Sequence, residues 1–90
     1  MFIALDGTRI VGMVCERDSC HIRKLYVDPV YHQKGIATVL MDMILARMNA
    51  RITISSSRHG LPFYLSYGFI PTDIEQNTNG FIYTPMEFFL

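Results

Sequence analysis

Short apolar runs alternate with polar breaks over the first third of the chain, which is typical of strands. An apolar run at residues 1–5 stops at Asp6-Gly7 and a second follows at residues 10–15, so the Asp-Gly pair predicts a hairpin turn. Residues 21–27 form a third apolar segment that ends at Asp28-Pro29, since proline has no N–H for a strand ladder. Three antiparallel strands therefore precede any helix.

After Gly35 the spacing of apolar residues changes to three and four positions, which predicts one long amphipathic helix. Polar residues, among them Asp42 and Arg47, fall largely between the apolar ones. The expected apolar face consists of Ile36, Val39, Leu40, Met43, Ile44 and Met48.

A strand follows this helix, because residues 51–55 include three consecutive β-branched side chains. A strand, a helix and a strand in this order predict a parallel crossover. Residues 61–67 predict a second, shorter helix, with Pro62 in its first turn and Gly68 suited to the left-handed position after its end.

The remainder of the chain predicts extended structure at Phe69-Ile70, a polar loop over residues 73–80 and a last strand over residues 81–89. Pro85 favours an edge strand or a bulge there. We expect one domain over residues 1–90 of α/β (α+β) class, with a mixed, mainly antiparallel sheet, a central strand-helix-strand crossover, one long helix and one short one.

Composition narrows the function. Eight basic residues balance eight acidic ones. We therefore expect no positive potential strong enough to attract nucleic acid or an acidic membrane surface. Half of the residues are hydrophobic, more than a domain of this size covers, and this predicts apolar contact with a ligand or a second subunit. We expect a homodimer.

The two cysteines, Cys15 and Cys20, are interpreted as reduced thiols in a chain with no secretory signal. The Cys20-His21 pair has no second pair of ligands at metal-site spacing, so no metal is expected. No stretch reaches the roughly 18 apolar residues that span a bilayer, and we expect a cytoplasmic protein.

The loop at residues 28–34, between the third strand and the long helix, is the first candidate site. A helix start has N–H groups without intrahelical partners and a partial positive charge, which favour an anion such as a diphosphate. Gly35 and Ala37 are small where bulk would keep a diphosphate from the backbone, Thr38 adds a hydroxyl and Lys34 a positive charge. Taken alone, the same pattern also fits an ordinary strand-to-helix turn.

The segment from Leu25 to Leu40 resembles the acetyl-CoA motif of the GNAT superfamily of N-acetyltransferases, which reads Q/R-x-x-G-x-G/A. His32-Gln33-Lys34-Gly35-Ile36-Ala37 aligns with it, with His32 in place of glutamine or arginine. The resemblance implies that Leu25 and Val27 offer main-chain groups to the pantetheine arm and that the pyrophosphate meets the N–H groups of residues 33–38. The cofactor-binding residues implied in this way are Leu25, Tyr26, Val27, His32, Gln33, Lys34, Gly35, Ile36, Ala37 and Thr38.

Residues 60–69 are similar to the second signature of the same family, F-Y-x-x-x-G-F, here Phe63-Tyr64 followed by Gly68-Phe69. The resemblance implies that Tyr64 lies near the thioester sulfur and protonates the departing thiolate as a general acid. A phenol with a reference pKa of about 10 carries its proton at neutral pH. Tyr67 and Phe69 are interpreted as core residues.

Direct attack on the thioester needs a neutral amine, so a base or a water chain has to accept a proton. Many members of the family carry a glutamate on the strand before the phosphate loop, where this chain has Arg23 and Lys24. Glu16, His21 and His59 are substitutes, each of which fits a surface or strand position better than the role of a base.

The resemblance implies an acetyltransferase that moves the acetyl group of acetyl-CoA to an amine of a small molecule or peptide by direct attack. The family fold usually begins with one more strand and one or two helices, whereas this sequence starts at the hairpin. We expect a fragment, a naturally short member, or a chain whose second copy supplies the missing wall of the acceptor site. A non-catalytic CoA-binding or dimerisation module is therefore the alternative. A nucleotide-binding fragment is a weaker third interpretation, because the dinucleotide fingerprint and the P-loop lysine-serine pair are absent.

Overall fold

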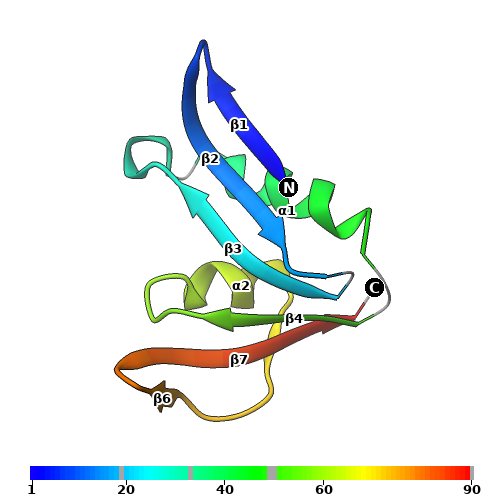
Figure 1. Cartoon of the computed structure of the whole chain (residues 1–90), viewed down its shortest axis with the longest axis vertical. Coiled ribbons are helices and arrows are strands. Elements are labelled where there is room, and N and C mark those ends of the chain that lie inside the picture. The colour runs from blue at the N-terminus through cyan, green and yellow to red at the C-terminus, as the bar shows by residue number, and fades with distance from the viewer. Residues whose placement is uncertain (19, 33, 49–50, 90) are drawn as a thin grey trace. The chain divides into compact units, whose positions relative to one another are not determined.

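The computed structural model describes residues 1–18, 20–32, 34–48 and 51–89 (Figure 1). Its backbone contacts divide the chain into two units, Met1–Asn49 and Ala50–Leu90. We call them the N-terminal unit and the C-terminal unit and describe each by itself. Both combine strands with one helix, and the described strand pairs within each unit are antiparallel. The mixed α+β class with one long and one short helix is confirmed.

The N-terminal unit contains three strands that pair in chain order: β1 (Phe2–Asp6), β2 (Arg9–Glu16) and β3 (His21–Val27). Gly7 in the first turn has a φ of 62°, a conformation that glycine adopts without strain. The three predicted strands and the Asp-Gly turn are confirmed.

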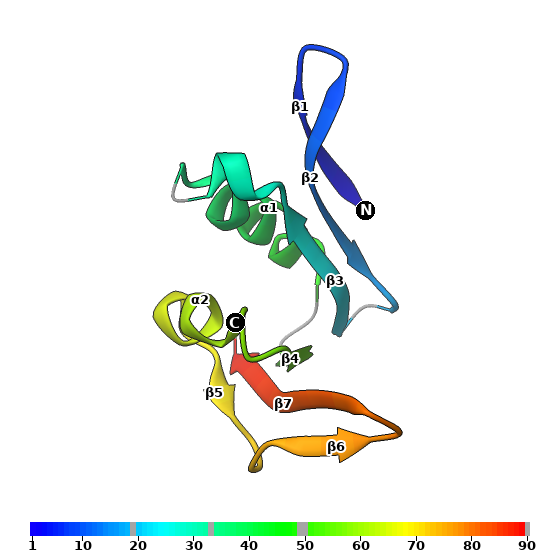
Figure 2. The ribbon, with the colours of Figure 1, turned by 90° about the vertical axis from the view of Figure 1, so that its left-hand side faces the viewer.

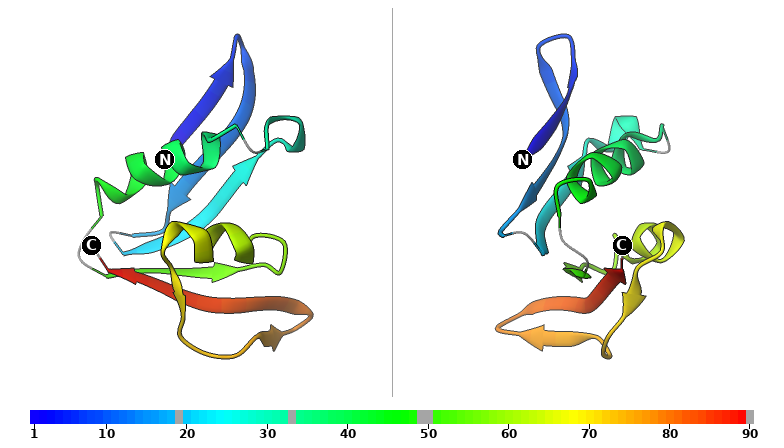
Figure 3. Two further views of the ribbon diagram at one scale, coloured as in Figure 1. Left: turned by 180° about the vertical axis from the view of Figure 1, so that it is seen from behind. Right: turned by 90° about the vertical axis from the view of Figure 1, so that its right-hand side faces the viewer.

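The helix α1 (Ile36–Leu45) packs against one face of these strands, most closely against β2. Figure 3, seen from behind, shows it in front of β1, β2 and β3. The predicted helix is confirmed, although it ends before Met48, which is buried in the turn that follows.

The predicted apolar face of α1 was wrong in part, because the buried face is rotated about the helix axis relative to it. Val39 and Met43 are 57% and 44% exposed, whereas Met41 and Leu45, which the pattern left out, are buried together with Leu40 and Ile44. The helix carries apolar residues around most of its circumference, so periodicity alone does not fix which of them meets the sheet.

Gly12 on β2 determines how closely α1 approaches the strands. A Cβ atom at this position would lie 3.1 Å from the carbonyl oxygen of Tyr26, 3.2 Å from Cδ1 of Leu40 and 3.3 Å from Cγ2 of Ile36. Because glycine has no side chain, the first two turns of the helix lie directly on the backbone of β2.

The C-terminal unit is built around its last strand. It contains β4 (Arg51–Ser56), α2 (Leu61–Tyr67), β5 (Ile70–Pro71), β6 (Gln76–Thr78) and β7 (Phe81–Phe89). Strand β7 pairs with β4 along one edge and with β5 and β6 along the other (Figure 2). The predicted strands at 51–55 and 81–89 and the helix at 61–67 are confirmed.

The loop predicted over residues 73–80 was wrong in its second half, where β6 pairs with the start of β7. Asn79 and Gly80 connect the two strands with φ values of 53° and 87°. Two consecutive positive φ angles are the geometry of a tight hairpin turn, for which Asn-Gly is the preferred pair. The polar residues of β6 have no apolar periodicity that would have marked them as a strand.

Pro85 lies inside β7 rather than on an edge strand, opposite Ser55 of β4. Its carbonyl oxygen accepts a hydrogen bond of 2.9 Å from the N–H of Thr72, so its ring nitrogen faces the same side. Pairing with β6 reaches Tyr83 and pairing with β5 begins at Met86. The proline therefore occupies the junction between two neighbouring strands, where a strand ladder donates no N–H.

Two further predictions concern the cysteines and membrane-spanning helices. Cys15 and Cys20 are free thiols, as expected. In the described ranges, no helix has both the length and the apolar content needed to cross a membrane.

Candidate functional site

The loop between β3 and α1 is ordered by Asp28. A short 3₁₀ helix covers Pro29–Tyr31, and the Asp28 carboxylate accepts a hydrogen bond of 3.0 Å from the N–H of Val30 at its start. The N–H of Tyr31 donates to the Asp28 carbonyl at 2.8 Å. The sequence placed Asp28 at the end of a strand but did not identify this capping role, which the Asp-Pro pair indicates.

Gly35 is the N-cap residue of α1 and has φ 78° and ψ 4°. Its carbonyl oxygen accepts the first helical hydrogen bond, from Val39 at 3.0 Å, and among the described residues no side chain caps the helix. The N–H groups of Ile36, Ala37 and Thr38 precede that bond, so they lack intrahelical partners. No atom within 4 Å would meet a Cβ at Gly35, which leaves this helix start accessible to an anion.

Two residues of β3 direct their main-chain groups away from β2. The N–H of Asp28 donates to the carbonyl of Val11 at 2.8 Å, and Tyr26 is the partner of Met13 two residues earlier. Because hydrogen bonding alternates along an antiparallel pair, the N–H and C=O groups of Leu25 and Val27 point to the other edge of β3. This is the orientation that a pantetheine arm lying along the strand requires.

Tyr26 differs from its two neighbours. Its main-chain groups pair with β2 and its side chain, which alternates with those of Leu25 and Val27, lies on the face of the strands away from α1. The structure thus groups Leu25 and Val27 with the start of α1 and separates Tyr26 from them.

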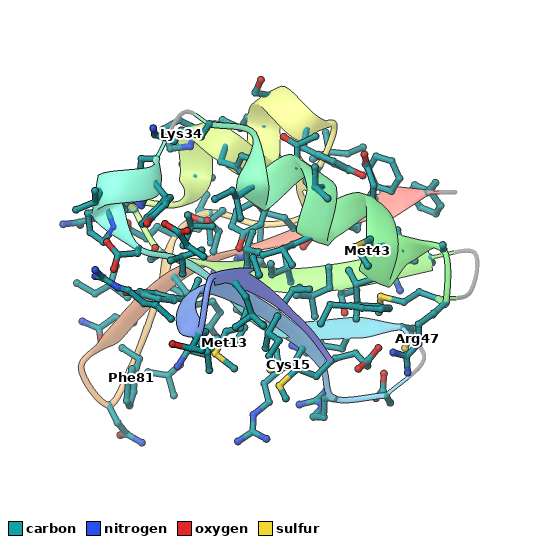
Figure 4. All side chains as sticks on the ribbon, turned by 90° about the horizontal axis from the view of Figure 1, so that it is seen from above. Met13, Cys15, Lys34, Met43, Arg47 and Phe81 are labelled. Atoms are coloured by element: carbon teal, nitrogen blue, oxygen red, sulfur yellow. The ribbon has the colours of Figure 1, made fainter. Side chains whose placement is uncertain are left out.

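His32, which replaces the glutamine or arginine of the family motif, folds back onto β3. Its Nε2 atom lies 2.9 Å from the carbonyl oxygen of Val27. Lys34 is exposed at the start of α1 (Figure 4) and adds a positive charge there. Gln33, the remaining predicted residue of the loop, lies outside the described residues.

Like Phe69, Tyr64 on α2 is buried in the C-terminal unit. Its ring makes edge-to-face contacts with Phe63 and Phe69 at centroid distances of 5.4 and 5.6 Å, and 7% of its surface is exposed. A Cβ at Gly60 would lie 3.1 Å from Cε2 of Tyr64. The ring is therefore held between two aromatic side chains and a glycine.

Burial raises the pKa of Tyr64 to about 12, because a phenolate loses hydration in this environment. Among the residues that the structure describes, none hydrogen-bonds the Tyr64 hydroxyl. At neutral pH the side chain is therefore a neutral hydrogen-bond donor that holds its proton more firmly than a free phenol does.

The serines at the end of β4 shape the turn that carries Gly60. The Ser57 hydroxyl accepts a hydrogen bond of 3.1 Å from the N–H of Gly60, and the Ser57 carbonyl accepts one of 3.1 Å from the N–H of Leu61. Ser56 is buried and donates to the same carbonyl at 2.8 Å. Serine before a helix is a capping signal, so the sequence contained the information for this role of Ser57.

The three substitutes for a base lie in different elements: Glu16 on β2, His21 on β3 and His59 in the turn before α2. Glu16 accepts a hydrogen bond of 2.8 Å from the Met1 amino group, which is the main cause of a lowered carboxyl pKa. Burial lowers the pKa of His21 on β3, so the imidazole is neutral at pH 7 but weakly basic. His59 is exposed in the turn before α2.

Comparisons with known proteins connect these features. The family described as Acetyltransferase (GNAT) domain matches residues 1–90, across both units. A curated relative, the uncharacterised N-acetyltransferase YafP of Escherichia coli K12, is 29% identical over 69 residues, which cover 77% of this chain and 45% of YafP.

Solved structures of similar fold include a GCN5-related N-acetyltransferase from Rhodopseudomonas palustris, with a TM-score of 0.82 and 26% identity. That match covers 98% of this chain and 59% of the other. PaiA N-acetyltransferase from Thermoplasma acidophilum, solved in complex with coenzyme A, has a TM-score of 0.72 at 19% identity, covering 98% of this chain and 58% of PaiA.

The chain thus spans about half the length of the curated relative that it matches and about three fifths of these structures. The family match nevertheless covers the whole chain and contains both motifs, the phosphate loop at Gly35 and the Phe63-Tyr64 segment. The chain belongs to the GNAT family of acetyltransferases.

Proposed function

We propose that the protein transfers the acetyl group of acetyl-CoA to an amine of a small molecule or peptide. The observation that carries this proposal is the start of α1, where three N–H groups without helical partners follow Gly35 and no side chain in the described part of the chain caps them. Such a helix start binds a diphosphate through hydrogen bonds and through the helix dipole, and it needs no net charge on the protein.

The main-chain groups of β3 that point away from β2 support the same donor. The outward N–H and C=O groups of Leu25 and the outward N–H of Val27 match the amide groups of a pantetheine arm, which would lie along the strand like an additional one. His32 contacts the remaining group, the Val27 carbonyl. We infer that His32 contributes by fixing the end of β3 rather than by contacting the phosphates directly.

The pKa of Tyr64 narrows its proposed role. The sulfur of the departing thiolate resembles a cysteine thiol, with a pKa of about 8.5, so complete transfer from a phenol with a pKa of about 12 is uphill by about 5 kcal/mol. Donation of a hydrogen bond from the Tyr64 hydroxyl carries no such cost. We infer that Tyr64 stabilises charge as it develops on sulfur and keeps its own proton.

In the proposed reaction the amine attacks the thioester directly, and no covalent enzyme intermediate forms. The lone pair of a neutral amine forms the N–C bond, the C–S bond breaks, and the thiolate and the proton released from the amine end as coenzyme A thiol and amide. Neither Glu16, with its lowered pKa, nor weakly basic His21 is suited to accept that proton. Water is the proposed acceptor.

A non-catalytic CoA-binding module is the second candidate. The observation that favours it is the pair of exposed residues Arg23 and Lys24 in the strand where many members of the family carry a glutamate. The module predicts binding of coenzyme A without turnover.

Calorimetry with coenzyme A and acetyl-CoA tests the donor site, and no heat of binding at high micromolar ligand would end the proposal. Acetyl-CoA-dependent thiol release in the presence of polyamines, aminoglycosides, amino acids and peptides separates the two candidates. We expect Tyr64→Phe to bind acetyl-CoA normally and to lower kcat by about 10- to 100-fold, within the range of one positioned donor.

A further inference from the structure

Four side chains join the β1–β2 turn to the loop that precedes α1. Asp6 and Arg9 are a directly opposed pair at the end of the hairpin, whereas Asp28 caps the 3₁₀ helix of the loop and Tyr31 is its last residue. All four belong to the N-terminal unit. We call this set the turn-to-loop clamp.

Two hydrogen bonds close the clamp. The Tyr31 hydroxyl donates to Oδ2 of Asp6, and Nη2 of Arg9 donates to Oδ2 of Asp28 at 2.8 Å. The turn thus supplies one carboxylate and one guanidinium group, and the loop supplies one phenol and one carboxylate. The Asp6 carboxylate raises the pKa of Tyr31, so the phenol remains a donor at neutral pH.

Asp28 transmits this attachment to the backbone of the loop. One of its carboxylate oxygens accepts from Arg9 and the other from the N–H of Val30. Its own N–H donates to Val11 and its carbonyl accepts from Tyr31. The side chain of Asp28 is only 15% exposed, against 64% for that of Arg9, so the acid that orders the loop is the more enclosed partner.

We propose that the turn-to-loop clamp holds residues 28–32 of the loop in their binding conformation before the ligand arrives, so that Asp6, Arg9, Asp28 and Tyr31 are positioning residues for the diphosphate of acetyl-CoA. This inference rests on the proposed function. Ordering a mobile loop opposes binding because backbone freedom is lost, and a loop that is already ordered avoids that loss. None of the four side chains needs to touch the ligand.

The test separates positioning of the diphosphate from general stability by using two acetyl donors. S-acetylpantetheine carries the thioester and the amide arm but no diphosphate, so the clamp has nothing to position in it. In Tyr31→Phe we expect the KM for acetyl-CoA and the Kd for coenzyme A to rise by about 3- to 10-fold, the effect of one typical hydrogen bond. We expect kcat, and kcat/KM for S-acetylpantetheine, to stay within about twofold.

A double-mutant cycle assigns the effect to the Tyr31–Asp6 contact. Asp6→Ala should weaken coenzyme A binding as Tyr31→Phe does, and the double variant should be no weaker than the weaker single variant. Arg17→Met is the matched control, since the Arg17 side chain pairs with Asp18 at 3.9 Å in the turn after β2. We expect Arg17→Met to leave the Kd unchanged.

The rate of amide hydrogen exchange in the loop measures, in the unliganded protein, how firmly the clamp holds the loop. We expect faster exchange at residues 29–32 in Tyr31→Phe than in the wild type or in Arg17→Met. Unchanged exchange, an unchanged Kd, or an equal loss with S-acetylpantetheine would each overturn the inference. A wild-type chain that exchanges as expected but binds no coenzyme A would instead contradict the proposed function.

Discussion

Burial of Tyr64 affects both the stability of the protein and the proposed role of this residue. Burial raises its pKa from 10 to about 12, so the folded protein holds the phenolic proton more tightly than the unfolded chain does. The resulting stabilisation is complete below pH 10 and is lost as the pH rises from 10 to 12, because the unfolded state ionises first. The shift corresponds to roughly 2–3 kcal/mol at most.

We therefore predict that the free energy of unfolding of the wild type falls more steeply between pH 10 and 12 than that of Tyr64→Phe. Urea unfolding at pH 7, 10, 11 and 12 measures both proteins, and the difference between them removes the contribution of other groups. Parallel curves for the wild type and Tyr64→Phe would show that Tyr64 is exposed in solution.

Among the elements, α1 carries the proposed coenzyme A site at its N-terminal end. Ala37→Glu places a carboxylate in the first turn, where it is favourable by about 0.3–1 kcal/mol for the helix dipole but repels a diphosphate. We predict a slightly more stable protein whose affinity for coenzyme A falls at least tenfold. Ala46→Glu at the other end of the helix should keep the affinity, as calorimetry and thermal unfolding will show. Equal affinities for the two variants would contradict the proposed site.

The contact between α1 and β2 gives a second prediction for this element. In Gly12→Ala the new methyl group meets the carbonyl of Tyr26 and the side chains of Leu40 and Ile36 at 3.1–3.3 Å. We predict a loss of about 1–3 kcal/mol in urea unfolding, the usual effect of overpacking. Leu40→Val removes one of the crowded atoms and should cost less in the Gly12→Ala background than in the wild type. An unchanged unfolding midpoint for Gly12→Ala would contradict the observed approach of the helix.

These elements also mark what the sequence could predict. The limits of β3 and α2 followed from local signals, an Asp-Pro pair at the end of the strand and Gly68 after the helix. The buried face of α1 did not, because it depends on the approach at Gly12 of a strand more than twenty residues away. The turn-to-loop clamp was missed for the same reason, since its two contacts join residues 25 and 19 positions apart.

Resemblance to a family contributed what local pattern could not. The phosphate loop alone fitted an ordinary turn, and Tyr64 alone fitted a core aromatic. The two motifs together predicted a family that the comparison over residues 1–90 confirmed. The resemblance did not anticipate that His32 contacts the Val27 carbonyl, because a histidine at that position departs from the motif.

At the scale of the whole molecule, exposed apolar surface predicts self-association. Ile3, Leu5, Val39 and Met43 are each 44–57% exposed and border one hollow of about 320 Å³ in the N-terminal unit. We predict a homodimer, with a sedimentation-equilibrium mass of twice 10.4 kDa. Val39→Lys should shift the equilibrium towards the monomer and Thr38→Lys should not. A wild-type mass of 10.4 kDa at high micromolar concentration would contradict the prediction.

The place of β7 in the C-terminal unit has a consequence for biosynthesis. Strand β7 pairs with β4, β5 and β6, so those three strands have no common partner until residues 81–89 have left the ribosome. In the N-terminal unit, by contrast, the pairs of β1 with β2 and of β2 with β3 need no residue beyond residue 27 and can form earlier during synthesis. The Tyr64 half of the protein closes only once the nine residues of β7 are available for pairing.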